Sequence, residues 1–376
     1  MDFIPSICYN KISFKAVLLF LNGIEVRQMA ITINQIAELC GVSRGTVDRA
    51  LHNKGNVRPE LSARIKEVAA EYGYTPNRAG MALSRASHPI RIGVVLHSVQ
   101  TPFISLVLDA CRREAKKLSV FSTDVIFRLS RSLDPVEQVS MIEELVEQQH
   151  VSGLAVMPLH SILVENKINE LVSEHHLPVI TLNTDLPQSK RLCYIGQDNY
   201  AAGRTAAELM RLVTGVKGIV SPLIGPSEYH LAYSERLSGF QSEIAQIAPD
   251  ITLRQTNIDA DDEACAMQAT LYLLDHVPDL AGIYAITPGY AGVCRALIQT
   301  GNAHKVHLIL HDEVRENLRY VHDGVVDFVL GQDAETQGSL PLTLLADFIQ
   351  LKQKPSKNAF FTDIRVLLRY NIGSLL

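Results

Sequence analysis

Residues 89–376 lack the short motifs that mark common catalytic and cofactor sites. This part of the chain has no GxGxxG after an apolar run, no Walker lysine, no HExxH and no GxSxG. It also has no Ser/His/Asp or Cys/His set at a spacing typical of a nucleophilic enzyme. The sequence therefore predicts that the protein is not an enzyme and needs no cofactor.

The six cysteines are scattered and form neither a CxxC pair nor a Cys/His cluster. This arrangement offers no ligand set for a metal and is typical of reduced thiols in a cytoplasmic protein. We therefore expect no metal site and a cytoplasmic location.

The chain has little in the way of long apolar segments. The apolar run at 16–21 has six residues, whereas a transmembrane helix needs about 20. No small-residue cleavage site typical of a signal peptide follows this run. We expect no membrane association, and we expect residues 1–28 to be an upstream extension of a native chain that starts at Met29.

An excess of basic charge is also missing from the chain as a whole, whose net charge is -5. The charge is unevenly spread, however, because residues 29–86 hold eight Lys/Arg against five Asp/Glu. Residues 1–28 hold three against two, so the remainder carries -9. A small basic head on an acidic body is typical of a protein that binds DNA with one end only. The length of 376 residues suits two or three domains of about 100–200 residues each.

Within this head the sequence has the pattern of a helix-turn-helix. Thr32 and Gln35 form a capping-box pair, and apolar residues at helical spacing follow them up to Gly41. Glycine ends helices because it adopts a left-handed conformation without a steric cost. Ser43 is a suitable N-cap for a second helix over 44–51. Two short helices joined by such a turn form a helix-turn-helix.

The outward face of this second helix suits DNA. Six residues on it are expected to contact DNA: Ser43, Arg44, Gly45, Thr46, Asp48 and Arg49. The two arginines suit guanine by bidentate geometry, and the two hydroxyl groups suit phosphates at the helix N-terminus. Asp48 is expected to orient Arg49 or to accept from a cytosine amino group. The alternative is a plain helical hairpin with solvated charges, which a third helix starting at Pro59 disfavours.

Several elements of the head occur together in one known family. They are Thr32-x-x-Gln35-Ile36-Ala37, Gly41-Val42-Ser43, Thr46-Val47-x-Arg49, Gly73-Tyr74-x-Pro76-Asn77 and Leu83. In these the head resembles the lactose-repressor and galactose-repressor family of bacterial transcription regulators. The resemblance implies a three-helix headpiece over 29–76 and a hinge helix with a linker over 77–88, whose leucine wedges into the minor groove. It adds five expected DNA contacts: Thr32, His52, Asn77, Arg78 and Leu83.

The body alternates short apolar runs with amphipathic stretches. Strands are expected at 91–96, 125–128, 153–157, 178–182, 219–224, 282–286, 306–310 and 328–330, and the first helix at 103–118. Apolar strands that alternate with helices are typical of parallel sheets covered on both faces. About nine strands exceed one ordinary sheet. The predicted fold is therefore α/β, with an all-α headpiece followed by a two-lobed body of doubly wound parallel sheets.

Polar side chains follow the ends of these strands, where open α/β sheets bind ligands. Eight residues at such places are candidates for an effector site: Thr101, Phe103, Asn183, Thr184, Arg236, Thr287, Asp312 and Gln332. Each alone is more often a cap or a loop residue, but their equivalent places favour a cleft. Carboxylate, amide and guanidinium groups hydrogen-bond several hydroxyls, and Phe103, with Tyr229 or Tyr233, can stack on a sugar face.

Two further segments, Pro102-Phe103 and Arg236-Leu-Ser-Gly239-Phe240, carry a second resemblance. They are similar to the periplasmic sugar-binding-protein fold, in its ribose-binding-like branch, which is the regulatory domain of the same repressor family. The resemblance implies three crossovers between two lobes, near 215, 331 and 354. Lobe 1 is then 89–215 with 332–353, and lobe 2 is 216–331 with 354–376.

Together these features predict a cytoplasmic DNA-binding transcription regulator, a repressor, controlled by a small polyhydroxylated effector such as a sugar, cyclitol or sugar acid. A homodimer is expected to place two headpieces on a palindromic double-stranded operator. The alternative is a sugar-binding protein of a transport system, in which the head would serve no purpose. An enzyme that acts on a sugar is a more distant alternative.

Overall fold

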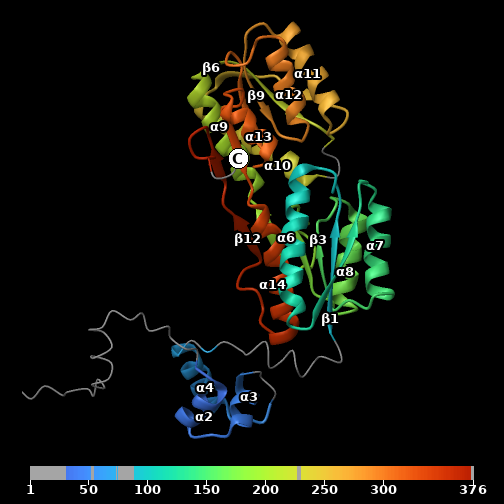
Figure 1. Ribbon diagram of the computed structural model, residues 1–376, viewed down its shortest axis with the longest axis vertical. Coiled ribbons are helices and arrows are strands. Elements are labelled where there is room, and N and C mark those ends of the chain that lie inside the picture. Colours follow the sequence, from blue (N-terminus) through green and yellow to red (C-terminus); the bar gives the residue numbers. More distant parts are fainter. Residues whose placement is uncertain (1–30, 52–54, 73, 75–88, 227–229, 374–376) are drawn as a thin grey trace, which may run out of the picture. The chain divides into compact units, whose positions relative to one another are not determined.

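The structure is a computed structural model that describes residues 31–51, 55–72, 74, 89–226 and 230–373. It divides into two compact units, Met1–Asn77 and Arg78–Leu376, which are drawn in Figure 1. The predicted upstream extension (1–28), the hinge segment (77–88) and His52 lie outside the described residues. No helix among the residues that are described combines the length and apolar content needed to cross a bilayer.

The described part of the first unit contains three helices, α2 (Ile33–Cys40), α3 (Arg44–Leu51) and α4 (Pro59–Glu71). The capping box before α2 is formed, because Thr32 accepts from Gln35 N and the Gln35 side chain accepts from Thr32 N at 2.9 Å. Gly41 ends this helix with φ of 68°, in the left-handed region. The expected helix over 44–51 is confirmed as α3.

The three helices share one small core. Ile36 from α2, Val47 and Ala50 from α3, and Ile65 and Ala69 from α4 are all buried in it. The apolar positions that follow each other at helical spacing therefore face inward. The polar face of α3 is left outside this core.

The second unit contains two sheets, each with helices on both faces (Figure 1). The first sheet is parallel throughout and has the order β12-β5-β4-β3-β1-β2. Its strands are β1 (Ile90–Leu96), β2 (Thr123–Leu129), β3 (Gly153–Val156), β4 (Val179–Leu182), β5 (Cys193–Gln197) and β12 (Ala359–Thr362). The helices around it are α6 (Pro102–Ser119), α7 (Pro135–Glu147), α8 (Ile162–Ser173) and α14 (Ala334–Leu351).

The second sheet has the order β13-β11-β10-β9-β6-β7, with β8 also paired to β6. Its strands are β6 (Lys217–Ile224), β7 (Asp250–Leu253), β8 (Thr256–Asn257), β9 (Leu280–Ala285), β10 (His307–His311), β11 (Phe328–Gly331) and β13 (Arg365–Leu367). Only β13 runs antiparallel among these pairings. The helices around it are α9 (Asn199–Thr214), α10 (Leu231–Ile247), α11 (Glu263–His276), α12 (Tyr290–Gln299) and α13 (Arg315–His322).

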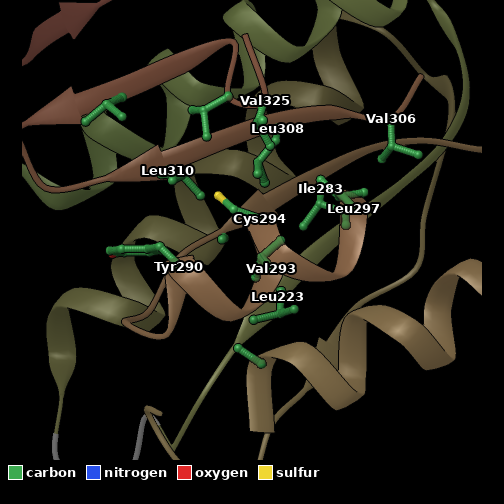
Figure 2. Packing of buried hydrophobic residues seen from close by; sticks show 14 of the residues in the cluster. Leu223, Ile283, Tyr290, Val293, Cys294, Leu297, Val306, Leu308, Leu310 and Val325 are labelled. Carbon is green, nitrogen blue, oxygen red and sulfur yellow. The ribbon is translucent and has the colours of Figure 1, made fainter. Parts of the chain in front are cut away.

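Both faces of each sheet are covered by apolar clusters. In the second lobe, Val293, Cys294 and Leu297 of α12 pack on Ile283 of β9 and Leu308 of β10 (Figure 2). A separate cluster under α9 and α10 fills the opposite face, where the rings of Phe240 and Tyr284 stack at 4.7 Å. This double coverage is the reason that the strands read as continuous apolar runs, and it confirms the α/β fold class.

The lobe boundaries differ from the prediction at two of the three crossovers. The chain passes into the second lobe directly after β5, near residue 198 and not near 215, because α9 packs on α10 and on β9, β10 and β11. It returns at 331–334, as expected. The last crossover follows β12, near 363 and not near 354, because β12 extends the first sheet beside β5.

Candidate functional site

The outer surface of α3 presents polar groups in an ordered arrangement. Ser43 Oγ lies 2.9 Å from Thr46 Oγ1 and accepts from Thr46 N at 3.2 Å, which caps the helix. Arg49 donates to Thr46 Oγ1 at 3.4 Å. Ser43, Arg44, Gly45 and Arg49 are exposed.

The remaining predicted DNA contacts in the described part of the head have different surroundings. Thr32 is exposed and serves as the N-cap of α2. Asp48 is half-buried and lies near Tyr74, whose pKa is raised first by burial and then by the Asp48 carboxylate. Asn77, Arg78, Leu83 and His52 lie outside the described residues.

The second unit has a cavity of about 610 Å³ between its lobes. Seven of the eight predicted effector residues line it: Thr101, Phe103, Asn183, Thr184, Arg236, Asp312 and Gln332. They come from the carboxyl ends of strands in both sheets and from the loops and helices that follow. The volume lies within the range of about 300–1,000 Å³ of small-molecule sites.

Thr287 does not line the cavity, contrary to the prediction. It is 1% exposed, and its Oγ1 accepts from Gly225 N at 3.0 Å. Its hydroxyl group fixes the loop after β6 to the loop after β9. Threonine commonly satisfies backbone groups in this way, which the sequence alone does not distinguish from ligand contact.

Backbone strain marks three turns at the strand ends. Ser98, Asn183 and Asp312 have φ of 52°, 61° and 72° and all three line the cavity. Residues other than glycine adopt this left-handed region at a cost of about 1–3 kcal/mol. Such strained positions cluster at ligand sites, where they fix the direction of a side chain.

Arg236 is held inside the second lobe on α10. It is 4% exposed, and its Nε donates to Asn199 Oδ1 at 3.1 Å. α9 and α10 approach closely at two glycines, since a Cβ on Gly203 would lie 2.0 Å from Arg236 O and one on Gly239 would lie 2.1 Å from Tyr200 O. The backbone that bears the guanidinium group is therefore set by glycine packing.

Asp312 is the buried carboxyl group of the site. It accepts from the Gln332 side chain and, at 3.4 Å, from the Tyr290 hydroxyl group. Burial raises the pKa of Asp312, and the Arg236 charge opposes that shift. Asp312 and Arg236 thus place a carboxyl group and a guanidinium group in the same wall, where they can accept from and donate to ligand hydroxyls.

The predicted effector residues of the first lobe are also held in place by their surroundings. Asn183 Nδ2 donates to Gln337 Oε1 at 2.9 Å, and Thr184 Oγ1 donates to Pro158 O at 2.7 Å. Phe103 is among the residues that line the cavity but is only 4% exposed, so its ring packs mainly in the core of the first lobe.

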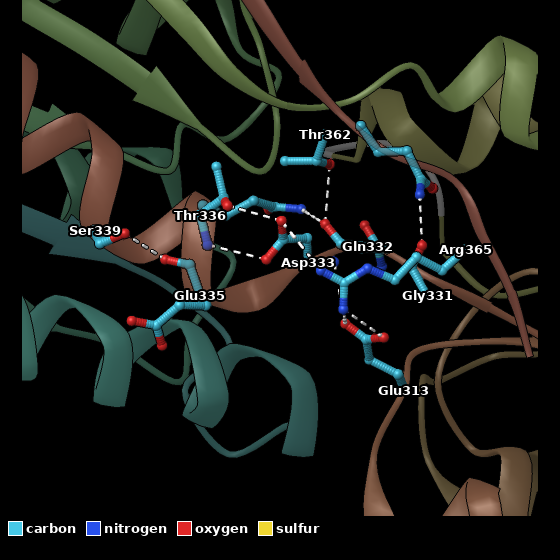
Figure 3. Close-up of polar contacts among 11 residues, drawn as sticks. Glu313, Gly331, Gln332, Asp333, Glu335, Thr336, Ser339, Thr362 and Arg365 are labelled. Carbon is cyan, nitrogen blue, oxygen red and sulfur yellow. Dashed lines mark hydrogen bonds and ion pairs between the residues drawn. The ribbon is translucent and has the colours of Figure 1, made fainter. Parts of the chain in front are cut away.

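Gln332 lies at the second crossover, in a dense polar cluster (Figure 3). Its carbonyl oxygen accepts from Thr362 Oγ1 at 2.9 Å and from Gln337 Nε2 at 2.7 Å. Arg365 pairs with Glu313 at 3.2 Å and with Asp333 at 3.3 Å in the same region. A ligand that contacts Gln332 therefore acts on the segment that joins the lobes.

Sequence reasoning missed several residues that line the cavity, among them His230, Asp261 and Tyr290. His230 stacks at 4.6 Å on Tyr233, which the sequence did suggest, and its ring centroid lies 5.3 Å from that of the buried His97. Asp261 accepts from Tyr233 at 3.1 Å and Tyr290 bonds to Asp312. The available signal was the acidic run at 259–263, which directly precedes α11.

Comparison with known proteins gives matches for both units. Residues 32–77 match the model of bacterial regulatory proteins of the lacI family, and residues 92–354 match the periplasmic binding protein domain. The chain is similar to the HTH-type transcriptional regulator MalR of Streptococcus pneumoniae, at 27% identity over 57% of this chain and 63% of MalR. The match thus spans less than two thirds of MalR. This chain is also similar to the HTH-type transcriptional regulator CelR of Thermobifida fusca, at 26% identity over 68% of this chain and 73% of CelR.

Among solved structures, the fold is similar to that of GanP, a glucose-galactose binding protein from Geobacillus stearothermophilus. The TM-score is 0.67 at 21% identity, over 76% of this chain and 99% of GanP.

Proposed function

We propose that the chain is a transcription regulator whose affinity for DNA depends on a small ligand. Its body belongs to the periplasmic binding protein domain family, and its head matches the model of bacterial regulatory proteins of the lacI family. One observation carries this proposal. A helix-turn-helix with an exposed polar face stands on the same chain as a two-lobed body with a polar cavity.

The head is proposed to read double-stranded DNA through α3. In a helix-turn-helix the first residues of the second helix meet base edges in the major groove. Arg44 and Arg49 are exposed there and suit guanine. Ser43 and Thr46, at the helix N-terminus, suit phosphates.

The cavity is proposed to bind a sugar-like effector. Asp312, Arg236 and Asn183 supply a carboxylate, a guanidinium group and an amide, which together recognise several hydroxyls. Proteins of this fold bind sugars, as the name of GanP states, and one relative is a sucrose operon repressor. The proposed role is therefore repression in the cytoplasm, relieved or promoted by the sugar-like compound.

Two subunits are proposed to pair, so that two heads meet two halves of a palindromic operator. Closure of the lobes on the effector, with its contact at Gln332, would shift the segment that joins them. The coupling between cavity and DNA is then an equilibrium property and must be reciprocal.

The alternative, a sugar-binding protein of a transport system, accounts for the body alone. Solved structures that are similar to this chain include sugar-binding proteins. This similarity is the observation that favours the alternative. The exposed face of α3 has no use in such a protein, so the presence or absence of sequence-specific DNA binding separates the two functions.

The test is a selection of bound duplexes from a random library, followed by an electrophoretic shift with the best duplex. Arg49→Ala is expected to weaken binding by about fivefold to 150-fold, because a bidentate arginine–guanine contact contributes about 1–3 kcal/mol of discrimination. Arg112→Ala, at an exposed ion pair on α6, is the matched control and should bind as the wild type does. Equal binding by both variants would contradict the assignment of α3.

A further inference from the structure

We propose that Gln337 is a positioning residue of the cavity, although it does not line the cavity itself. It fixes the side-chain amide of Asn183, so that the oxygen of that amide is left to accept from a ligand hydroxyl. The inference rests on the proposed function of the cavity as an effector site. It adds to that site a residue that acts on the ligand through another.

Gln337 is a buried amide near the start of α14. It is 0% exposed, and its backbone N donates to Asp333 O at 3.2 Å. The next residue, Gly338, packs closely on α6, since an added Cβ would lie 2.4 Å from Val107 O. The backbone that carries the Gln337 side chain is therefore held in place from two directions.

A backbone carbonyl sets the direction of the Gln337 amide. Its Nε2 donates to Gln332 O at 2.7 Å, and a carbonyl oxygen can only accept. Thr362 Oγ1 donates to the same oxygen at 2.9 Å (Figure 3). If the amide turned over, its Oε1 would face that carbonyl oxygen with no hydrogen between them, which is costly in a buried place. The Oε1 of Gln337 therefore points to its other neighbour, Asn183.

That oxygen in turn determines how the Asn183 amide lies. Asn183 Nδ2 donates to Gln337 Oε1 at 2.9 Å, and a reversed amide would bring two oxygens together. The backbone of Asn183 is already fixed, with φ of 61° and with its N donating to Ile195 O at 2.9 Å. Its carbonyl oxygen accepts from the Tyr194 hydroxyl group at 2.9 Å. Only the side-chain rotation remains free, and the bond to Gln337 fixes it.

The Oδ1 atom of Asn183 is thereby left for the ligand. Asn183 lines the cavity, and no group among the described residues donates to its Oδ1. An amide oxygen has two lone pairs, and a sugar hydroxyl is a donor that can use them. The direction of this amide thus decides whether the wall offers an acceptor at this point.

The same crossover residue also holds the carboxyl group of the second lobe. The Gln332 side chain donates to Asp312, while its carbonyl oxygen holds Gln337. Asn183 follows a strand of the first sheet and Asp312 a strand of the second, and both line the cavity. A continuous set of hydrogen bonds therefore joins ligand-facing groups of both lobes through Gln337 and Gln332.

The test is calorimetric titration of the full chain with a panel of D-ribose, D-arabinose, D-glucose, D-galactose, D-allose, D-tagatose and myo-inositol. The compound that binds most tightly is the probe for the variants. Gln337→Met keeps the length of the side chain, removes both of its hydrogen bonds and is expected to weaken the probe about threefold to tenfold. A panel in which no compound binds would overturn the proposal.

Gln350→Met is the matched control. Gln350 is a second buried glutamine of α14, and its Nε2 donates to Thr123 Oγ1 at 2.7 Å, away from the residues that line the cavity. The same change there is expected to lower stability while the affinity for the probe stays that of the wild type. Equal losses of affinity in Gln337→Met and Gln350→Met would overturn the proposal.

Asn183→Asp separates positioning from a general loss of packing. An aspartate cannot donate to Gln337 Oε1, and Gln337 cannot turn without losing its bond to Gln332 O. Asn183→Asp alone is therefore expected to weaken the probe by about tenfold or more. In the Gln337→Met background no oxygen opposes the carboxylate, and the same change is expected to weaken the probe by about threefold or less.

A loss from Asn183→Asp that is equal in both backgrounds would overturn the proposal, because a merely structural role of Gln337 predicts additive effects. Gln337→Leu, which also lacks the amide, is expected to repeat the pattern and supplies the second background if Gln337→Met does not fold. Thermal unfolding followed by circular dichroism shows whether each variant is folded.

These outcomes are separate from those that test the proposed function. A chain that binds a selected duplex but shows no coupling between Asn183 and Gln337 remains a regulator. A chain that shows the coupling but binds no duplex retains this inference about the cavity and loses the regulatory role.

Discussion

Gly203→Ala tests the idea that the packing of two helices sets the position of Arg236. The added Cβ would lie 2.0 Å from Arg236 O, whereas an ordinary van der Waals contact needs about 3.5 Å. The backbones of α9 and α10 must therefore separate by about 1.5 Å at this point. Because the carbonyl of Arg236 itself is pushed, the guanidinium group inside the cavity moves with it.

The magnitude follows from two opposing effects. Overpacking costs about 1–3 kcal/mol, and a contact with backbone belongs at the upper end. Alanine returns about 1 kcal/mol through its helix propensity. The net loss of about 2 kcal/mol corresponds to a fall of roughly 4–8 °C in the melting temperature of a body of this size.

The assay is thermal unfolding followed by circular dichroism, with titration of the tightest ligand found in the panel. Gly203→Ala is expected to lower the melting temperature by the stated amount and to weaken the ligand at least tenfold. Gly373→Ala, where no atom lies within 4 Å of the new Cβ, is the control. A Gly203→Ala protein that melts and binds as the wild type does would refute the packing argument.

Two further predictions concern the cavity wall. Arg236→Lys removes the Nε donor to Asn199 and should weaken the ligand at least tenfold in calorimetry, while Arg204→Lys, at an exposed pair on α9, should not. Burial first and the Arg236 charge second lower the pKa of His230 in the folded chain to about 4. Below about pH 6.5 this histidine therefore binds a proton in the unfolded chain more readily than in the folded chain. Stability is therefore lost as pH falls, by about 2 kcal/mol at pH 5 for this residue. His230→Phe should shrink the drop in melting temperature between pH 7 and pH 5, and an unchanged drop would contradict the burial argument. Burial raises the pKa of Asp261 to about 6, so protonation of this residue makes the folded chain more stable as pH falls. For this reason the drop in melting temperature is compared between the wild type and His230→Phe.

The sequence predicted those features that depend on local chemistry. The capping pair Thr32 and Gln35 and the left-handed Gly41 depend on neighbouring residues only, and α3 was confirmed over Arg44–Leu51. Seven of the eight effector residues predicted from the sequence line the cavity, because the carboxyl ends of parallel strands meet at one edge of a sheet. Arg236 and Asp312 line the cavity for that reason.

Features that depend on distant pairing were not predictable in the same way. Nothing local tells whether the amphipathic segment that forms α9 covers the first or the second sheet; its contact with α10 through Gly203 and Gly239 decides this. β12 joins the first sheet by pairing with β5 at the edge of that sheet, about 160 residues later in the chain, which no local pattern indicates. Thr287 follows a strand as the other candidates do, yet its hydroxyl oxygen accepts a hydrogen bond from Gly225 N.

The central claim is that one chain couples DNA binding at the head to ligand binding in the cavity. The most direct test is fluorescence anisotropy of the selected duplex, titrated with the full chain in the absence and presence of saturating ligand. We predict specific binding whose dissociation constant changes by about fivefold or more on addition of ligand, with the same change in ligand affinity when DNA is added. Specific binding that is the same with and without saturating ligand, or no specific binding at all, would contradict the account.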